Sequence, residues 1–116
     1  MKKLTSEVFD FIAQNRAAAF ATSSKQNIPH VATVFCVADD DLTIYFATRV
    51  ESRKFRNLSA QPVVSMAFTN EKLMETVELT GTAKRVESLP EEQEILYRLV
   101  TLRHQERNQE PPPMQL

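Results

Sequence analysis

The segment from Thr76 to Lys84 constrains the fold more than any other part of the sequence, because its side chains alternate strictly in polarity. One parity is apolar or small and the other is polar: Val77, Leu79, Gly81 and Ala83 against Thr76, Glu78, Thr80, Thr82 and Lys84. A period of two is typical of a β-strand with one face on a core and the other open to water or a ligand. The chain must therefore contain a sheet, and we expect Gly81 on the core face to permit a bend or close packing.

Four earlier segments also favour strands, at 17–22, 28–37, 42–48 and 62–69. Segment 28–37 carries apolar residues at both parities, so we expect both of its faces to be covered. A short acidic turn, Asp39–Asp41, separates it from segment 42–48. Strands joined by so short a turn pair as an antiparallel hairpin.

Helical patterns flank these strands. Apolar residues recur at helical spacing over 4–14 and 51–59, and Ser88–Glu91 is a capping box that opens a third helix ending near Arg107. The fold class is therefore mainly β or α+β, an antiparallel barrel or strongly curved sheet with flanking helices. We expect one domain over residues 1–110, followed by an extended proline-rich tail at 111–116.

The chain contains one glycine in 116 residues, where average usage would give about eight. A P-loop requires two glycines and the dinucleotide-binding fingerprint requires three, so both are excluded. Any nucleotide phosphate would have to be held by side chains and helix ends.

Charge, cysteine and histidine content narrow the class of protein and the compartment in which it functions. The 14 Lys plus Arg against 15 Asp plus Glu disfavour a protein that grips duplex DNA over its whole surface. The one cysteine, Cys36, alternates with apolar neighbours and indicates a core thiol in a reducing compartment. His30 has no second ligand at metal spacing, so we expect a surface histidine and no metal site. With no apolar run of about 20 residues and no signal-peptide pattern, we expect a cytoplasmic protein.

The segment Thr48–Lys54 holds the candidate site. If Ser52 caps the following helix, Arg53 and Lys54 fall in its first turn, where the positive end of the macrodipole disfavours cations. A phosphate there would accept hydrogen bonds from the Ser52 hydroxyl, from backbone N–H groups and from both cations. The alternative interpretation is a solvated basic face with Glu51 as a weak ion-pair partner.

The order and spacing of these features resemble the pyridoxamine 5'-phosphate oxidase family, the FMN-binding split barrels. Thr48–Lys54 is similar to the family's T-x-x-x-S-R-K motif, and it follows a hairpin whose first strand comes after Pro29. Residues 57–68 resemble the family's N-L-x-x-x-P pattern and the apolar strand behind it, and Thr76–Gly81 resembles its long fifth strand. The resemblance covers roughly Phe11–Ser88.

This resemblance implies an antiparallel split β-barrel that forms a homodimer, with FMN in grooves at the subunit interface. The family's motif residues hold the FMN phosphate or line its groove, and here they are Thr48, Ser52, Arg53 and Lys54. Thr76 matches a position that contacts the flavin through a glutamine, and Thr33 lies on the strand along which the isoalloxazine ring runs.

One departure from the family concerns the substrate. Members that oxidise pyridoxamine phosphate have an arginine and a lysine where this chain has Ala32 and Val37. The resemblance therefore implies an FMN-dependent oxidoreductase whose small-molecule substrate and catalytic groups stay open. The alternative is a non-catalytic module that binds flavin, deazaflavin or haem in storage, sensing or a stress response, and FAD is a further alternative cofactor.

A function of another class also stays open. Basic residues surround Phe55 and lie near two strand aromatics, a pattern that single-stranded nucleic acid can use: Arg49, Arg53, Lys54 and Arg56 with Tyr45 and Phe46. The balanced net charge disfavours this reading.

Overall fold

The computed structural model describes residues 2–106, which divide into two compact units, one ending at Lys84 and the other beginning at Arg85. The first unit contains α1 (Lys2–Gln14), β1 (Ala17–Ser23), β2 (Pro29–Phe35), β3 (Val37–Ala38), β4 (Ile44–Tyr45), α2 (Arg53–Ala60), β5 (Val63–Asn70) and β6 (Glu75–Thr82). The second contains α3 (Leu89–Glu106). The predicted tail at 111–116 and the predicted domain boundary at residue 110 lie outside the described residues. Within residues 2–106, no helix combines the length and hydropathy that a membrane span requires.

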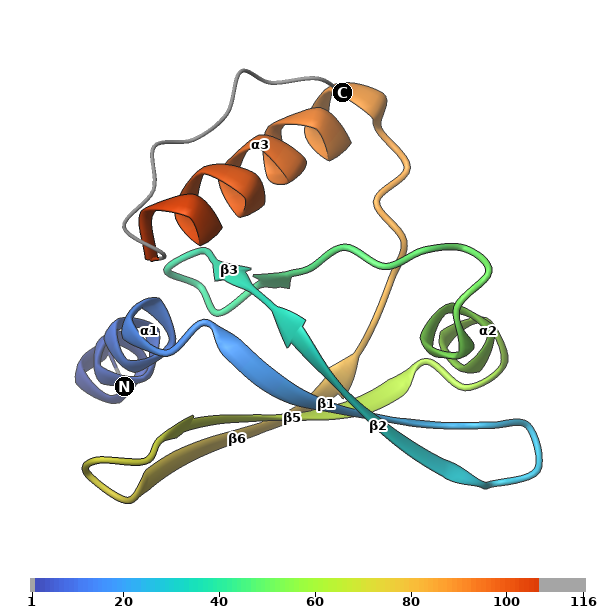
Figure 1. Ribbon diagram of the computed structural model, residues 1–116, viewed down its shortest axis with the longest axis horizontal. Coiled ribbons are helices and arrows are strands. Elements are labelled where there is room, and N and C mark those ends of the chain that lie inside the picture. Colours follow the sequence, from blue (N-terminus) through green and yellow to red (C-terminus); the bar gives the residue numbers. More distant parts are fainter. Residues whose placement is uncertain (1, 107–116) are drawn as a thin grey trace. The chain divides into compact units, whose positions relative to one another are not determined.

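A twisted four-stranded sheet is the main element of the first unit (Figure 1). Its strand order is β2-β1-β5-β6, and all neighbours are antiparallel. Phe20 of β1 pairs with Ala32 on one side and Met66 on the other, and Met66 in turn pairs with Leu79. Both α1 and α2 lie on the same side of this sheet (Figure 1). The expected antiparallel α+β architecture is confirmed.

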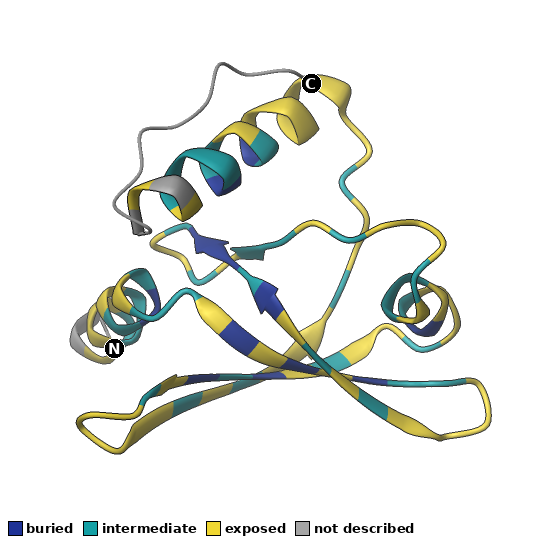
Figure 2. Ribbon diagram, viewed as in Figure 1, coloured by how far each residue is buried: buried dark blue, intermediate teal, exposed yellow. Residues whose placement is uncertain are grey.

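The core lies on the side of the sheet that α1 and α2 cover. Along β1, burial alternates residue by residue, with Ala18, Phe20 and Thr22 inside (Figure 2). Phe20 is completely buried, which contributes about 1.5–3 kcal/mol for a side chain of this type. Its ring lies 4.7 Å from that of Phe46, centroid to centroid. Phe46 thus packs against the core, so its ring does not form part of an open base-stacking surface.

The predicted strand 28–37 is interrupted. Its pairing with β1 ends at Phe35, and the N–H of Cys36 then donates to the Arg16 carbonyl at 2.9 Å. The expected hairpin with segment 42–48 is present only as the short β3–β4 pair, and Leu42 adopts a left-handed φ of 66° in the intervening turn. A strand of two residues, Ile44–Tyr45, replaces the longer one predicted.

The opposite side of the sheet, which we call the outer face, is open in the single chain. It consists of Ala17, Ala19, Ala21, Val31, Thr33, Phe35, Val63, Ser65, Ala67, Thr69, Thr76, Glu78, Thr80 and Thr82. Val31 and Val63 are 65% and 62% exposed. The expectation that both faces of segment 28–37 are covered is therefore wrong for one chain, and Glu78 is the one charged residue among these outward side chains.

Gly81 also departs from expectation. It is exposed, and a Cβ placed on it would meet no atom within 4 Å. Close packing therefore does not explain a glycine here within one chain.

Candidate functional site

The start of α2 is built as the sequence predicts. Ser52 has the extended backbone of an N-cap, with φ −75° and ψ 157°, and its Oγ accepts the N–H of Phe55 at 3.1 Å. Oγ1 of Thr48 lies 2.9 Å from Oγ of Ser52, so these two hydroxyls share a hydrogen bond. Thr48 and Ser52 are four residues apart in the sequence, and both are half-buried.

Positive charge collects at this capped end. The first turn of α2 contains Arg53 and Lys54 and no acidic residue, and neither cation has an ion-pair partner within the described chain. Their backbone N–H groups open the helix, where an α-helix offers them no carbonyl. The dipole and the two cations thus add potential of the same sign, which favours an anion at this position.

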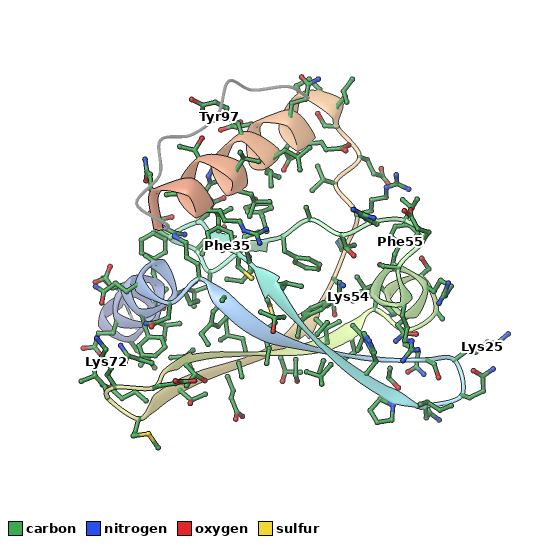
Figure 3. All side chains as sticks on the ribbon, viewed as in Figure 1. Lys25, Phe35, Lys54, Phe55, Lys72 and Tyr97 are labelled. Carbon is green, nitrogen blue, oxygen red and sulfur yellow. The ribbon has the colours of Figure 1, made fainter. Side chains whose placement is uncertain are left out.

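The two cations differ in exposure. Arg53 is exposed, whereas Lys54 is half-buried. In Figure 3, Lys54 extends from α2 toward the strands, while Lys25 and Lys72 project from turns at the ends of the sheet. Nη1 of Arg56 donates to the backbone carbonyl of Glu51, 3.4 Å away. Among the described residues, the Glu51 carboxylate forms no ion pair with the basic face. Of the two cations in the first turn of α2, Lys54 is thus the less exposed.

The remaining two site residues lie elsewhere. Thr33 of β2 pairs with Ala19 of β1. Thr76 of β6 pairs with Thr69 of β5, and their hydroxyl oxygens are 3.3 Å apart. Both are exposed on the outer face. Because β2 and β6 are the opposite edges of the sheet, one chain does not bring Thr33 and Thr76 together.

Sequence reasoning missed the residues that hold α2 in place. Asn57 is 5% exposed and donates from Nδ2 to Oγ1 of Thr22, itself 4% exposed, at 3.0 Å. Gln61, at the end of the helix, donates from Nε2 to the Ser24 carbonyl and to Oδ1 of Asn27. The available signal was an asparagine beside Leu58 on the apolar edge of a short helix, a position where a polar side chain needs a buried partner.

Cys36 and His30 were the other two residues considered, and the structure confirms the prediction for only the first. Burial raises the pKa of the Cys36 thiol to about 12, against a smaller opposing effect of Arg16, which confirms a core thiol. His30 was expected at the surface but is half-buried, and its Nδ1 is enclosed with no hydrogen-bond partner in the described chain. No group of His, Cys, Asp and Glu side chains within the described residues could hold a metal ion.

Comparison with known proteins places this geometry in a family. A family model described as pyridoxamine 5'-phosphate oxidase matches residues 4–115. The chain belongs to the pyridoxamine 5'-phosphate oxidase family. The resemblance inferred from motif order is confirmed, and the match extends beyond both ends of the segment that carried it.

Members of this fold with known structures differ in the ligands their names describe. The haem storage protein HutZ from Vibrio cholerae is 18% identical, with a TM-score of 0.65 over 86% of this chain and 72% of its own. An F420 reductase is 19% identical, with a TM-score of 0.66 over 89% of this chain and 80% of its own. PhzG from Burkholderia lata, in complex with tetrahydrophenazine-1-carboxylic acid, is 19% identical, with a TM-score of 0.66 over 97% of this chain and 56% of its own.

At these identities the likeness establishes the split-barrel fold and not a shared ligand. No curated protein sequence matches the chain. The pyridoxamine 5'-phosphate oxidase family is thus shown by sequence, and the fold by structure.

Proposed function

We propose that this chain binds FMN and acts as a flavin-dependent oxidoreductase, with the FMN phosphate at the start of α2. The observation that carries the proposal is a capped helix N-terminus whose first turn holds Arg53 and Lys54 and no acidic residue. Ser52 would donate its hydroxyl hydrogen to the phosphate, with Thr48 beside it. Membership of the pyridoxamine 5'-phosphate oxidase family supports a flavin as the group that carries this phosphate.

We infer that the functional unit is a homodimer assembled through the outer face. This face is uncharged except for Glu78 and exposes Val31 and Val63, an unusual surface in a chain with 25% charged residues. Thr33 and Thr76, on opposite edges of one sheet, would line the same groove only if a second copy supplied one of them. Dimerisation would also give β2 the two-sided coverage that its sequence predicts.

In this proposal the flavin supplies the electron chemistry, and the polypeptide supplies binding and orientation. The start of α2 fits the phosphate end of FMN, because its donors are a hydroxyl, helix N–H groups and two cations. Neither Ala32 nor Val37 adds a cation to this set. The phosphate therefore depends on Arg53 and Lys54 more heavily than in relatives with basic residues at those two positions.

The test begins with the absorbance spectrum of the purified protein and mass spectrometry of whatever denaturation releases. We expect oxidised-flavin absorbance, FMN as the released mass, and NADH- or NADPH-dependent turnover with an electron acceptor. A haem spectrum would favour the binding alternative that the name of HutZ suggests, and a released deazaflavin would favour the one suggested by the F420 reductase. Failure to take up added FMN would contradict the proposal.

A charge-matched pair of variants tests the phosphate assignment. Arg53→Ala with Lys54→Ala should weaken FMN binding at least a hundredfold, since charge-assisted contacts contribute about 1.5–3 kcal/mol each. Lys72→Ala with Lys84→Ala removes the same charge from exposed positions outside α2 and should change the FMN Kd less than twofold. Equal effects of the two double variants would contradict the assignment.

A further inference from the structure

Buried hydrogen bonds hold α2 in place, together with partial packing of Leu58 against the core. The helix has eight residues, too few to be stable alone in water. Of these residues, all of which the structure describes, only Asn57 is buried, and Phe55 and Leu58 are half-buried. The best-buried contact of α2 is therefore the polar one, from Asn57 to Thr22 of β1.

A second set of hydrogen bonds joins the end of the helix to the β1–β2 turn. The N–H of Gln61 donates to the Asn57 carbonyl at 2.7 Å, which closes the helix. Its side-chain Nε2 donates to the Ser24 carbonyl at 2.5 Å and to Oδ1 of Asn27 at 2.9 Å. The turn is itself ordered, because Oγ of Ser24 accepts the N–H groups of Gln26 and Ile28.

These contacts determine the orientation of the opposite end of α2. Residues three apart on a helix share a face, so Asn57 and Lys54 point toward the same side. The bond from Asn57 to Thr22 fixes the rotation of the helix about its axis, and the bonds from Gln61 fix its far end. Together they set the direction in which Lys54 and the first N–H groups of α2 point.

We propose that Asn57 and Gln61 are positioning residues for the anion site at the start of α2. They contact no ligand in this arrangement, and they act by holding an eight-residue helix in one rotation and tilt. A binding constellation needs its donors within about 0.5 Å of the productive geometry, which a loosely held helix does not maintain. The inference rests on the proposed FMN phosphate site and adds to it a requirement for the β1–β2 turn.

The test compares Gln61→Glu with Gln26→Glu. The first variant keeps the side-chain shape but removes the N–H donors to Ser24 and Asn27. The second adds the same charge in the β1–β2 turn that Gln61 contacts, at an exposed residue whose side chain makes none of these bonds. Each is titrated with FMN and with riboflavin, which lacks the phosphate, and its unfolding is followed in urea.

We expect Gln61→Glu to weaken FMN binding about tenfold and riboflavin binding less than twofold, while Gln26→Glu leaves both within twofold. Thr22→Val, which removes the acceptor of Asn57, should reproduce the selective loss for FMN. A merely structural role predicts equal losses for the two ligands, and that result would overturn the proposal. Wild-type protein with no preference for FMN over riboflavin would instead overturn the phosphate site, and the inference with it.

Discussion

Replacing Ser52 by aspartate separates the two roles that the structure gives to the start of α2. Aspartate is as good an N-cap as serine, and its carboxylate can accept the Phe55 N–H that Oγ of Ser52 now accepts at 3.1 Å. The new negative charge lies at the positive end of the helix beside Arg53 and Lys54, which contributes about 0.3–1 kcal/mol of stability. Ser52→Asp should therefore be as stable as the wild type or slightly more stable. Ser52→Ala removes the cap and should cost about 1 kcal/mol.

Binding should respond in the opposite direction. A carboxylate about 4 Å from a phosphate charge costs about 4 kcal/mol at an effective dielectric constant near 20, which is about a thousandfold in Kd. The assay is urea unfolding of the ligand-free variants together with FMN and riboflavin titrations, in which riboflavin binding should change little. If Ser52→Asp bound FMN within twofold of the wild type, or lost as much stability as Ser52→Ala, the reasoning about this helix end would be refuted.

Three further outcomes follow from the fold. Ala19→Asp places a charge at the centre of the outer face and should disrupt the proposed dimer, giving a monomer in sedimentation with an unchanged circular dichroism spectrum. A dimer that persists in this variant would exclude the outer face as the interface. Burial raises the pKa of Cys36 from 9.0 to about 12, so its contribution to folding is complete below pH 9 and is lost as pH rises toward 12, by up to about 1.4 kcal/mol per pH unit. In urea unfolding above pH 9, Cys36→Ala should lose stability less steeply than the wild type, and parallel slopes would contradict this account. Gly81→Ala meets open space and should be neutral or stabilise the protein by up to about 1 kcal/mol; a loss of stability in the same assay would indicate a neighbour that one chain does not supply.

Local patterns were enough to predict much of the fold and part of the site. The alternation of Val77 and Leu79 with Thr76 and Glu78 predicts β6, because side-chain direction in a strand repeats every two residues. The cap at Ser52 depends only on atoms within three residues, and the structure confirms it. The family was readable from the order of such local features along the chain.

Other features depend on which distant segments become neighbours. The predicted strand 28–37 divides because residues up to Phe35 pair with β1, whereas Val37 pairs with Tyr45 of β4 in a second sheet. Its apolar outward residues suggested two-sided burial, but the sheet order leaves Val31 uncovered in one chain. Periodicity reports which residues avoid water without saying what covers them.

The sequence by itself determined β1, β5 and β6, the capped helix with its two cations, and the family, because periodicity and capping act over a few residues. Only the tertiary structure decided that Thr33 and Thr76 lie on opposite edges of the sheet, and that Asn57 reaches Thr22 across 35 positions of the chain. Such pairings arise when β1 becomes the strand between β2 and β5. Hydrogen bonds between segments far apart in sequence form only after that arrangement exists, and no local pattern encodes it.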